Sequence, residues 1–122
     1  MNRLRGKVAV VTGGNAGIGE AIAKAFAREG ASVVITGRRQ GELDRVVNDI
    51  VKEQGKAFAI AGSVTDESHV QDTVRRTVQQ FGRLDILVNN AGVGDFGKRL
   101  HEIDDATWAQ GMDVNLTGVF RM

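Results

Sequence analysis

Residues 7–19 read KVAVVTGGNAGIG, a short β-branched run that leads directly into a glycine-rich turn. Apolar residues then recur at helical spacing, at Ile18, Ala21, Ile22, Ala25 and Phe26. Glycine adopts positive φ at no steric cost and has no side chain to block a ligand. The stretch therefore predicts a strand, a tight turn and a helix whose N-terminal N–H groups face outward, which suits a pyrophosphate.

Outward from this unit, strand-like and helix-like segments alternate along the chain. Further strands are predicted over residues 32–36, 57–61 and 85–89. One helix is predicted from Leu43, Val46, Val47, Ile50 and Val51, and the next from Val70, Val74 and Phe81. Thr65 or Asp66 can cap the latter, and a last helix is predicted to begin near residues 105–107. The βαβαβαβα order predicts an α/β fold, a Rossmann-type, doubly wound parallel sheet in three layers, of which this chain supplies the first half.

Composition excludes several classes of protein. An apolar fraction of 42% and a charged fraction of 25% are those of a globular domain rather than a disordered or fibrous chain. The net charge of +1 favours neither nucleic acid nor a membrane surface as a partner. Without cysteine there is no disulfide or thiolate metal site, and we expect no metal. The first apolar run is too short for a signal peptide or a membrane span, so we expect a cytoplasmic protein.

The first loop, residues 12–19, has the spacing G-x-x-x-G-x-G rather than G-x-G-x-x-G. It contains no Gly-Lys-Ser/Thr, which disfavours a nucleoside triphosphatase P-loop. A tight turn that binds nothing remains the alternative, because glycine-rich turns alone are weak signals.

The second loop tests whether the first one binds a dinucleotide, because such a site has a ribose-reading residue about 20 positions further on. Gly37-Arg38-Arg39 stands there, and no acid occurs before Glu42. A carboxylate would bind the 2′-hydroxyl of NAD and repel a 2′-phosphate, whereas Arg38 can pair with that phosphate in a forked geometry. The loop predicts NADP rather than NAD. The alternative is two solvated arginines at the start of a helix.

The loops after the third and fourth strands also carry polar residues. Gly62-Ser63-Val64 passes the adenine in this fold, and Ser63 serves either to hydrogen-bond the ring or to begin the next helix. Asn89-Asn90-Ala91-Gly92 combines amides that can pin neighbouring strand ends with small residues that let backbone approach a cofactor. A plain Asn-Gly turn is the alternative.

The last helix places Asn115 on the same face as Trp108, Met112, Leu116 and Val119. An amide on a face that should be buried is costly unless it is hydrogen-bonded. Asn115 is therefore either a tie between this helix and the fourth strand or an amide of a catalytic site.

Together these stretches resemble the classical short-chain dehydrogenase/reductase family over essentially the whole chain. The motifs that carry the resemblance are Thr12-Gly13-x-x-x-Gly17-Ile18-Gly19, Asn89-Asn90-Ala91-Gly92 and Val114-Asn115-Leu116. The resemblance implies hydride transfer between NADP(H) and a small alcohol or carbonyl substrate. We also expect a homo-oligomer, because in the strand order 3-2-1-4 the fourth strand would have no partner on its outer edge within this chain.

The resemblance also implies roles for single residues. Those expected to bind the cofactor are Gly13, Asn15, Gly17, Ile18, Gly19, Arg38, Arg39, Ser63, Val64, Asn90, Ala91 and Gly92. The glycine loop would contact the pyrophosphate and its ribose, Arg38 would select NADP with support from Arg39, and Ser63 would lie at the adenine. Asn115 matches the active-site asparagine that organises a proton-relay water. Ser63 departs from the family, which often has Asp there, and neither Asn15 nor Ala16 supplies the basic residue of some NADP-dependent members.

The family's catalytic Ser, and the Tyr that stands four positions before a Lys, have no counterpart here. The chain contains no Tyr, and its three serines, Ser32, Ser63 and Ser68, lie among the nucleotide-binding motifs. We therefore expect residues 1–122 to be an NADP-binding Rossmann domain that ends before the catalytic region, and to lack reductase activity alone. A non-catalytic dinucleotide-binding module and a fragment without a ligand are the alternatives.

Overall fold

The computed structural model describes residues 2–91, 105–112 and 114. Strands and helices alternate along them as the sequence predicts. In chain order they are β1 (Val8–Thr12), α1 (Gly17–Arg28), β2 (Ser32–Gly37), α2 (Gln40–Lys52), β3 (Lys56–Ala61), α3 (Glu67–Phe81), β4 (Ile86–Val88) and α4 (Asp105–Met112).

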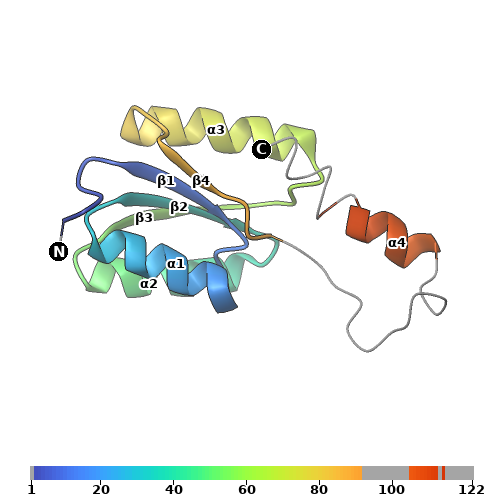
Figure 1. Cartoon of the computed structure of the whole chain (residues 1–122), viewed down its shortest axis with the longest axis horizontal. Coiled ribbons are helices and arrows are strands. Elements are labelled where there is room, and N and C mark those ends of the chain that lie inside the picture. The colour runs from blue at the N-terminus through green and yellow to red at the C-terminus, as the bar shows by residue number, and fades with distance from the viewer. Residues whose placement is uncertain (1, 92–104, 113, 115–122) are drawn as a thin grey trace.

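The strands form one parallel sheet of four, in the order β3-β2-β1-β4. In the register of the sheet, Val10 of β1 lies beside Val34 of β2 and Leu87 of β4. Helices α1 and α2 cover one face and α3 covers the other, which makes three layers (Figure 1). The predicted α/β Rossmann-type fold and the predicted strand order are confirmed. Within the described residues β4 pairs only with β1, and self-association through its other edge stays a prediction.

Two apolar clusters hold the layers together. Under α1 and α2, Val11, Val33 and Ile35 of the sheet pack with Leu43 and Val46 of α2, all fully buried. Under α3 a smaller cluster forms around the buried side chains of Val10, Val34 and Ile60, from strands β1, β2 and β3. Because strands β1 and β2 are covered on both faces, their sequences are continuously apolar rather than alternating.

The apolar spacing predicts the first helix correctly but its buried face only in part. Of the predicted stripe, Ile22 and Phe26 pack against the core, whereas Ile18 is 72% exposed and Ala21 and Ala25 are exposed as well. The helix also buries Gly19 and Ala23, and a Cβ on Gly19 would lie 2.2 Å from the carbonyl oxygen of Gly13. In the other two predicted stripes, Val51 and Val74 are also exposed.

The ends of α3 show how local sequence sets a helix boundary. Of the two predicted caps, the structure uses Asp66, whose carboxylate accepts hydrogen bonds from the backbone N–H groups of Ser68 and His69. Gly82 ends the helix at a φ of +82°, a left-handed conformation that favours glycine. Helix α4 begins at Asp105, within the predicted range.

A membrane-spanning helix or a cluster of metal ligands would indicate another kind of function. No helix in the described ranges is both long enough and apolar enough to cross a membrane. Nor do His, Cys, Asp and Glu side chains in that part of the chain gather in groups of three or more that could hold a metal ion.

Candidate functional site

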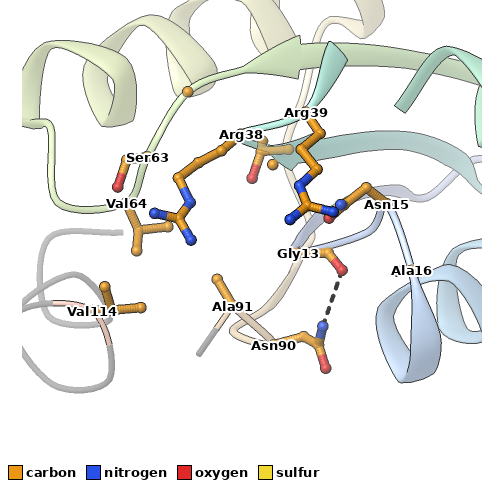
Figure 2. Close-up of a pocket in the computed structure, with 13 residues that line it drawn as sticks. Gly13, Asn15, Ala16, Arg38, Arg39, Ser63, Val64, Asn90, Ala91 and Val114 are labelled. Carbon is orange, nitrogen blue, oxygen red and sulfur yellow. Dashed lines mark hydrogen bonds between the residues drawn. The ribbon is translucent and has the colours of Figure 1, made fainter. Parts of the chain in front are cut away.

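A cleft of about 340 Å³ lies beyond the carboxyl ends of the strands (Figure 2). In doubly wound sheets ligands bind beyond the carboxyl ends of the strands, at the point where the strand order reverses, which here lies between β1 and β4. Each of the four loops after a strand contributes to the wall of the cleft. The lining residues are Gly13, Asn15, Ala16, Thr36, Gly37, Arg38, Arg39, Gly62, Ser63, Val64, Asn90, Ala91 and Val114.

Most of the residues that the sequence predicts for a cofactor meet in this cleft, but not all. The predicted residues in its lining are Gly13, Asn15, Arg38, Arg39, Ser63, Val64, Asn90 and Ala91. Gly17, Ile18 and Gly19 are outside the lining, because they form the first turn of α1 behind the loop. Gly92 and the predicted catalytic residue Asn115 lie outside the described residues. The lining also includes five residues that the sequence motifs do not predict to bind the cofactor, four of them next to predicted residues: Ala16, Thr36, Gly37, Gly62 and Val114.

The glycine loop lies close to the sheet because its glycines have no side chains. A side chain at these positions would collide with neighbouring atoms. A Cβ on Gly14 would lie 2.7 Å from side-chain atoms of Ile35, and one on Gly19 would lie 2.2 Å from the carbonyl oxygen of Gly13. Gly13 itself has a φ of +68°. Among the described residues no side chain caps the N-terminus of α1, where Ala16 is the N-cap. The free N–H groups and the helix dipole therefore make this end of the cleft suitable for an anion.

Hydrogen bonds join the end of β1 and the glycine loop to the end of β4 and the residues that follow it. The side-chain Nδ2 of Asn90 donates to the carbonyl oxygen of Gly13 over 3.2 Å (Figure 2). The hydroxyl of Thr12 accepts from the backbone N–H groups of Asn90 and Ala91, each over 3.0 Å, and donates to the carbonyl of Val88 over 3.3 Å. The prediction that an asparagine amide pins neighbouring strand ends is confirmed for Asn90.

Arg38 and Arg39 give the cleft its positive charge. Both side chains are exposed and extend over the cleft (Figure 2). Neither forms an ion pair within the described part of the chain. The described lining contains no Asp or Glu. An anionic group that entered at the end of β2 would therefore meet two unneutralised guanidinium groups.

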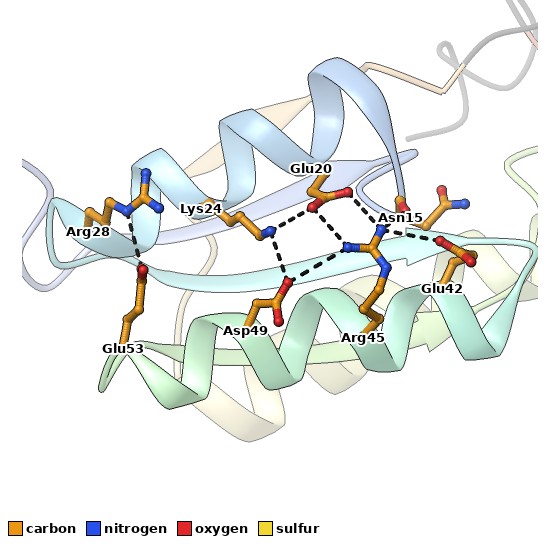
Figure 3. Close-up of polar contacts among 8 residues, drawn as sticks. All are labelled: Asn15, Glu20, Lys24, Arg28, Glu42, Arg45, Asp49 and Glu53. Carbon is orange, nitrogen blue, oxygen red and sulfur yellow. Dashed lines mark hydrogen bonds and ion pairs between the residues drawn. The ribbon is translucent and has the colours of Figure 1, made fainter.

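A cluster of charged residues between α1 and α2 supports the loop from behind (Figure 3). Glu20 accepts hydrogen bonds from Lys24 over 2.6 Å and from Arg45 over 2.9 Å. These bonds lower the pKa of the Glu20 carboxyl to about 2. Arg45 also pairs with Glu42 and donates to the carbonyl oxygen of Asn15 over 3.4 Å. The cluster thereby joins the glycine loop to α2.

Ser63 takes part in the turn that leads into α3. Its hydroxyl lies 2.7 Å from that of Thr65 and accepts the Thr65 N–H over 3.2 Å. Ser63 also lines the cleft. It therefore belongs both to the turn before the helix and to the wall of the cleft.

His69 lies directly under this loop and restricts it. A Cβ on Gly62 would lie 2.2 Å from the ring atom Nδ1 of His69, so only glycine fits above the imidazole. The His69 side chain is buried, and its Nε2 has no hydrogen-bond partner among the described residues. Burial lowers the pKa of His69 below its usual 6.5, against the opposing influence of Asp66 and Asp72.

This burial predicts a loss of stability in mild acid. Because the pKa is lower in the folded state, the unfolded chain takes up the proton first. The contribution of neutral His69 is therefore complete above about pH 6.5 and declines as the pH falls toward the folded-state pKa. Urea unfolding between pH 7.5 and 5.5 should show the decline, and His69→Phe should flatten it. An equal slope in the wild type and in this variant would contradict the assignment.

The sheet order, the glycine loop and a cleft at the carboxyl strand ends define a Rossmann-type α/β protein. The chain belongs to the short-chain dehydrogenase/reductase family, since the family model described as short chain dehydrogenase matches residues 7–122. The resemblance inferred from the sequence motifs is thereby confirmed.

Individual relatives agree with the family. The chain is 45% identical over 120 residues to an uncharacterized oxidoreductase of Methylorubrum extorquens, covering 98% of this chain and 48% of that protein. It is 38% identical over 120 residues to a 3-oxoacyl-[acyl-carrier-protein] reductase of Thermotoga maritima, again covering 98% of this chain and 48% of that protein. A crystal structure of a metagenomic short-chain oxidoreductase in complex with NADP superposes with a TM-score of 0.89 at 40% identity, covering 97% of this chain and 53% of that one. The chain thus spans about half the length of these relatives.

Proposed function

We propose that this chain binds NADP(H) and forms the cofactor-binding part of an oxidoreductase that acts on alcohol or carbonyl groups. The observation that carries the proposal is the charge of the cleft, where the described lining has two arginines and no carboxylate. A phosphate pairs with a guanidinium through two parallel charge-assisted hydrogen bonds, whereas a ribose hydroxyl gains much less from it. The NADP complex of a relative of 40% identity supports the same cofactor.

The residues present fit such a cofactor along the length of the cleft. The uncapped N-terminus of α1 and the glycine loop would hold the pyrophosphate. Arg38, with Arg39, would hold the 2′-phosphate, and Ser63 and Val64 would lie at the adenine. Asn90 and Ala91, with Gly92 beyond them, would line the path toward the nicotinamide ribose.

When bound, the nicotinamide would supply or accept the hydride. This chain's own residues would bind the cofactor and orient it in the cleft. Reduction of a carbonyl also needs a proton donor, and the chain has no Tyr. We propose that this donor belongs to sequence that these 122 residues do not contain, and that Asn115 serves as an active-site amide beside it.

We expect NADP⁺ to bind the purified protein more tightly than NAD⁺ does. Arg38→Met should weaken NADP⁺ binding about 10- to 100-fold, the value of a charge-assisted hydrogen bond, and leave NAD⁺ binding nearly unchanged. Isothermal titration calorimetry at fixed salt measures both affinities. Arg28→Met is the matched control, because Arg28 loses the same charge far from the cleft, where it pairs with Glu53.

Each other result excludes a different part of the proposal. Equal affinity for the two cofactors would contradict the preference for NADP. Binding of neither would favour a fragment without a ligand. Tight binding without oxidation of NADPH by any of a panel of ketones, in a form of the protein that includes a Tyr-x-x-x-Lys segment, would favour a non-catalytic binding module.

A further inference from the structure

Gly62 lies in the walls of two cavities. With Ser63 and Val64 it lines the cleft, on the side where we propose that the adenine binds. It also lines a second hollow of about 460 Å³, which lies at the start of α3. Its backbone N–H donates a hydrogen bond to the carbonyl oxygen of Gly37 over 2.8 Å and so joins the loop to the end of β2. Whatever supports Gly62 from behind therefore affects the shape of the cleft.

The imidazole ring of His69 lies directly behind Gly62. A Cβ built on Gly62 would lie 2.2 Å from Nδ1 and 2.5 Å from Cγ of the ring, so the ring occupies the place where a side chain of residue 62 would begin. His69 is only 7% exposed. Its backbone is fixed within α3, because its N–H donates to the carboxylate of Asp66 over 3.4 Å and its carbonyl accepts from the hydroxyl of Thr73 over 2.8 Å. The ring can leave this place only by rotating about its own side-chain bonds.

This place suits the neutral form of the imidazole. A neutral ring carries one N–H group, whereas a protonated ring carries two. Nε2 of His69 is buried without a hydrogen-bond partner among the described residues, and Nδ1 lies against the backbone of Gly62. A buried cation without acceptors is costly, and burial accordingly lowers the pKa of His69. Uptake of a proton should therefore drive the ring out from behind Gly62.

The second hollow offers a protonated ring a better place. In its described lining the acids are Asp66 and Asp72, and both favour the charged form of His69. Arg75 is the one cation in that lining, and it is paired with Asp72. The lining residues that come from β3 and from the loop after it carry no charge. A neutral ring is thus favoured behind Gly62, and a charged ring is favoured beside the carboxylates.

We propose that His69 is a positioning residue for the cofactor: its neutral ring supports the loop of residues 62–64 against β2, and uptake of a proton withdraws that support and weakens cofactor binding. The inference rests on the proposed binding of NADP(H), but it does not depend on the choice between NADP and NAD. Affinity is then highest above about pH 6.5, where the ring is neutral, and declines as the pH falls toward the folded-state pKa of His69.

Calorimetric titration of the purified protein with NADP⁺ between about pH 7.5 and 5.5 tests the proposal. The 2′-phosphate itself takes up a proton in this range, so the quantity compared is the ratio of the affinities of His69→Phe and the wild type at each pH. We expect this ratio to rise about 5-fold as the pH falls, which is the lower end of the usual range for coupling between two sites. His101→Asn is the matched control, since it removes the other of the two histidines and should keep the wild-type profile. Thermal unfolding without cofactor at each pH reports folding separately.

A second measurement needs no variant at position 69. Because coupling between two sites is reciprocal, NADP⁺ should lower the pKa of His69 further, by the logarithm of the same factor. The negative charge of the cofactor alone would raise that pKa, so the two explanations predict opposite signs. Proton NMR of the imidazole signals measures the pKa with and without cofactor, and the signal that remains in His101→Asn is that of His69.

The results separate the role of His69 from the function on which it rests. A ratio that rises in acid and a pKa that NADP⁺ lowers support both. A ratio that stays constant, or a pKa that NADP⁺ raises or leaves unchanged, would mean that His69 serves only the fold, and would leave the proposed function in place. Absence of NADP⁺ binding at every pH contradicts the inference and the proposed function together.

Discussion

Gly19→Ala is expected to weaken NADP⁺ binding about 100-fold or more and to lower the free energy of unfolding by about 1–3 kcal/mol. A Cβ at this position would lie 2.2 Å from the carbonyl oxygen of Gly13 and 2.5 Å from Nδ2 of Asn90. Those two atoms form the hydrogen bond that joins the glycine loop to the end of β4. The new methyl group must therefore separate α1 from the loop, and the N–H groups that would hold the pyrophosphate move with it.

Calorimetric titration with NADP⁺ and urea unfolding measure the two effects. Gly41→Ala is the control, because Gly41 lies in the exposed first turn of α2 with open space around its Cβ position. That variant should retain its affinity and change stability by less than about 1 kcal/mol, on the stabilising side. Wild-type affinity in Gly19→Ala would show that the close approach of α1 to the loop is unimportant for the cofactor.

The sequence was sufficient for the fold in large part because its two central strands, β1 and β2, are buried on both faces. All five residues of β1 are buried, and four consecutive residues of β2 are as well, which makes each a recognisable apolar run between helical segments. It was only partly sufficient for the buried face of α1. Ile22 and Phe26 pack against the core as their spacing indicates, but Ile18 is exposed, and the most deeply buried positions are the small residues Gly19 and Ala23.

Much of the candidate site could be predicted for a related reason. Parallel strands bring their carboxyl ends to one edge, so loops that are far apart in sequence must converge there. Individual contacts within the cleft depend instead on register and on side-chain placement. The sequence predicts that Gly37-Arg38-Arg39 stands near the ribose, but only the structure shows that Asn15 lies against the Cβ position of Gly37. It also contained no signal that His69 lies beneath Gly62.

Contacts of the Thr12 side chain were also not predictable from the sequence. Its hydroxyl is expected to stabilise the fold by about 2–4 kcal/mol relative to valine at the same position. Thr12 is almost fully buried and makes three hydrogen bonds, one to the last residue of β4 and two with the residues after it. Thr12→Val keeps the shape of the side chain but removes its only polar atom. The Ala91 N–H then loses its partner, while the Asn90 N–H keeps a bond to the carbonyl of Val88.

The neighbouring strand supplies a matched control for that variant. Thr36 lies beside Thr12 in the register of the sheet and is equally buried, but its hydroxyl makes no hydrogen bond with the described residues. Thr36→Val should therefore change the free energy of unfolding by less than about 1 kcal/mol. Urea unfolding compares the two variants, and an unchanged m-value shows that the difference lies in stability. Equal losses in both would mean that burial of a hydroxyl, rather than the tie between β1 and the end of β4, determines the effect.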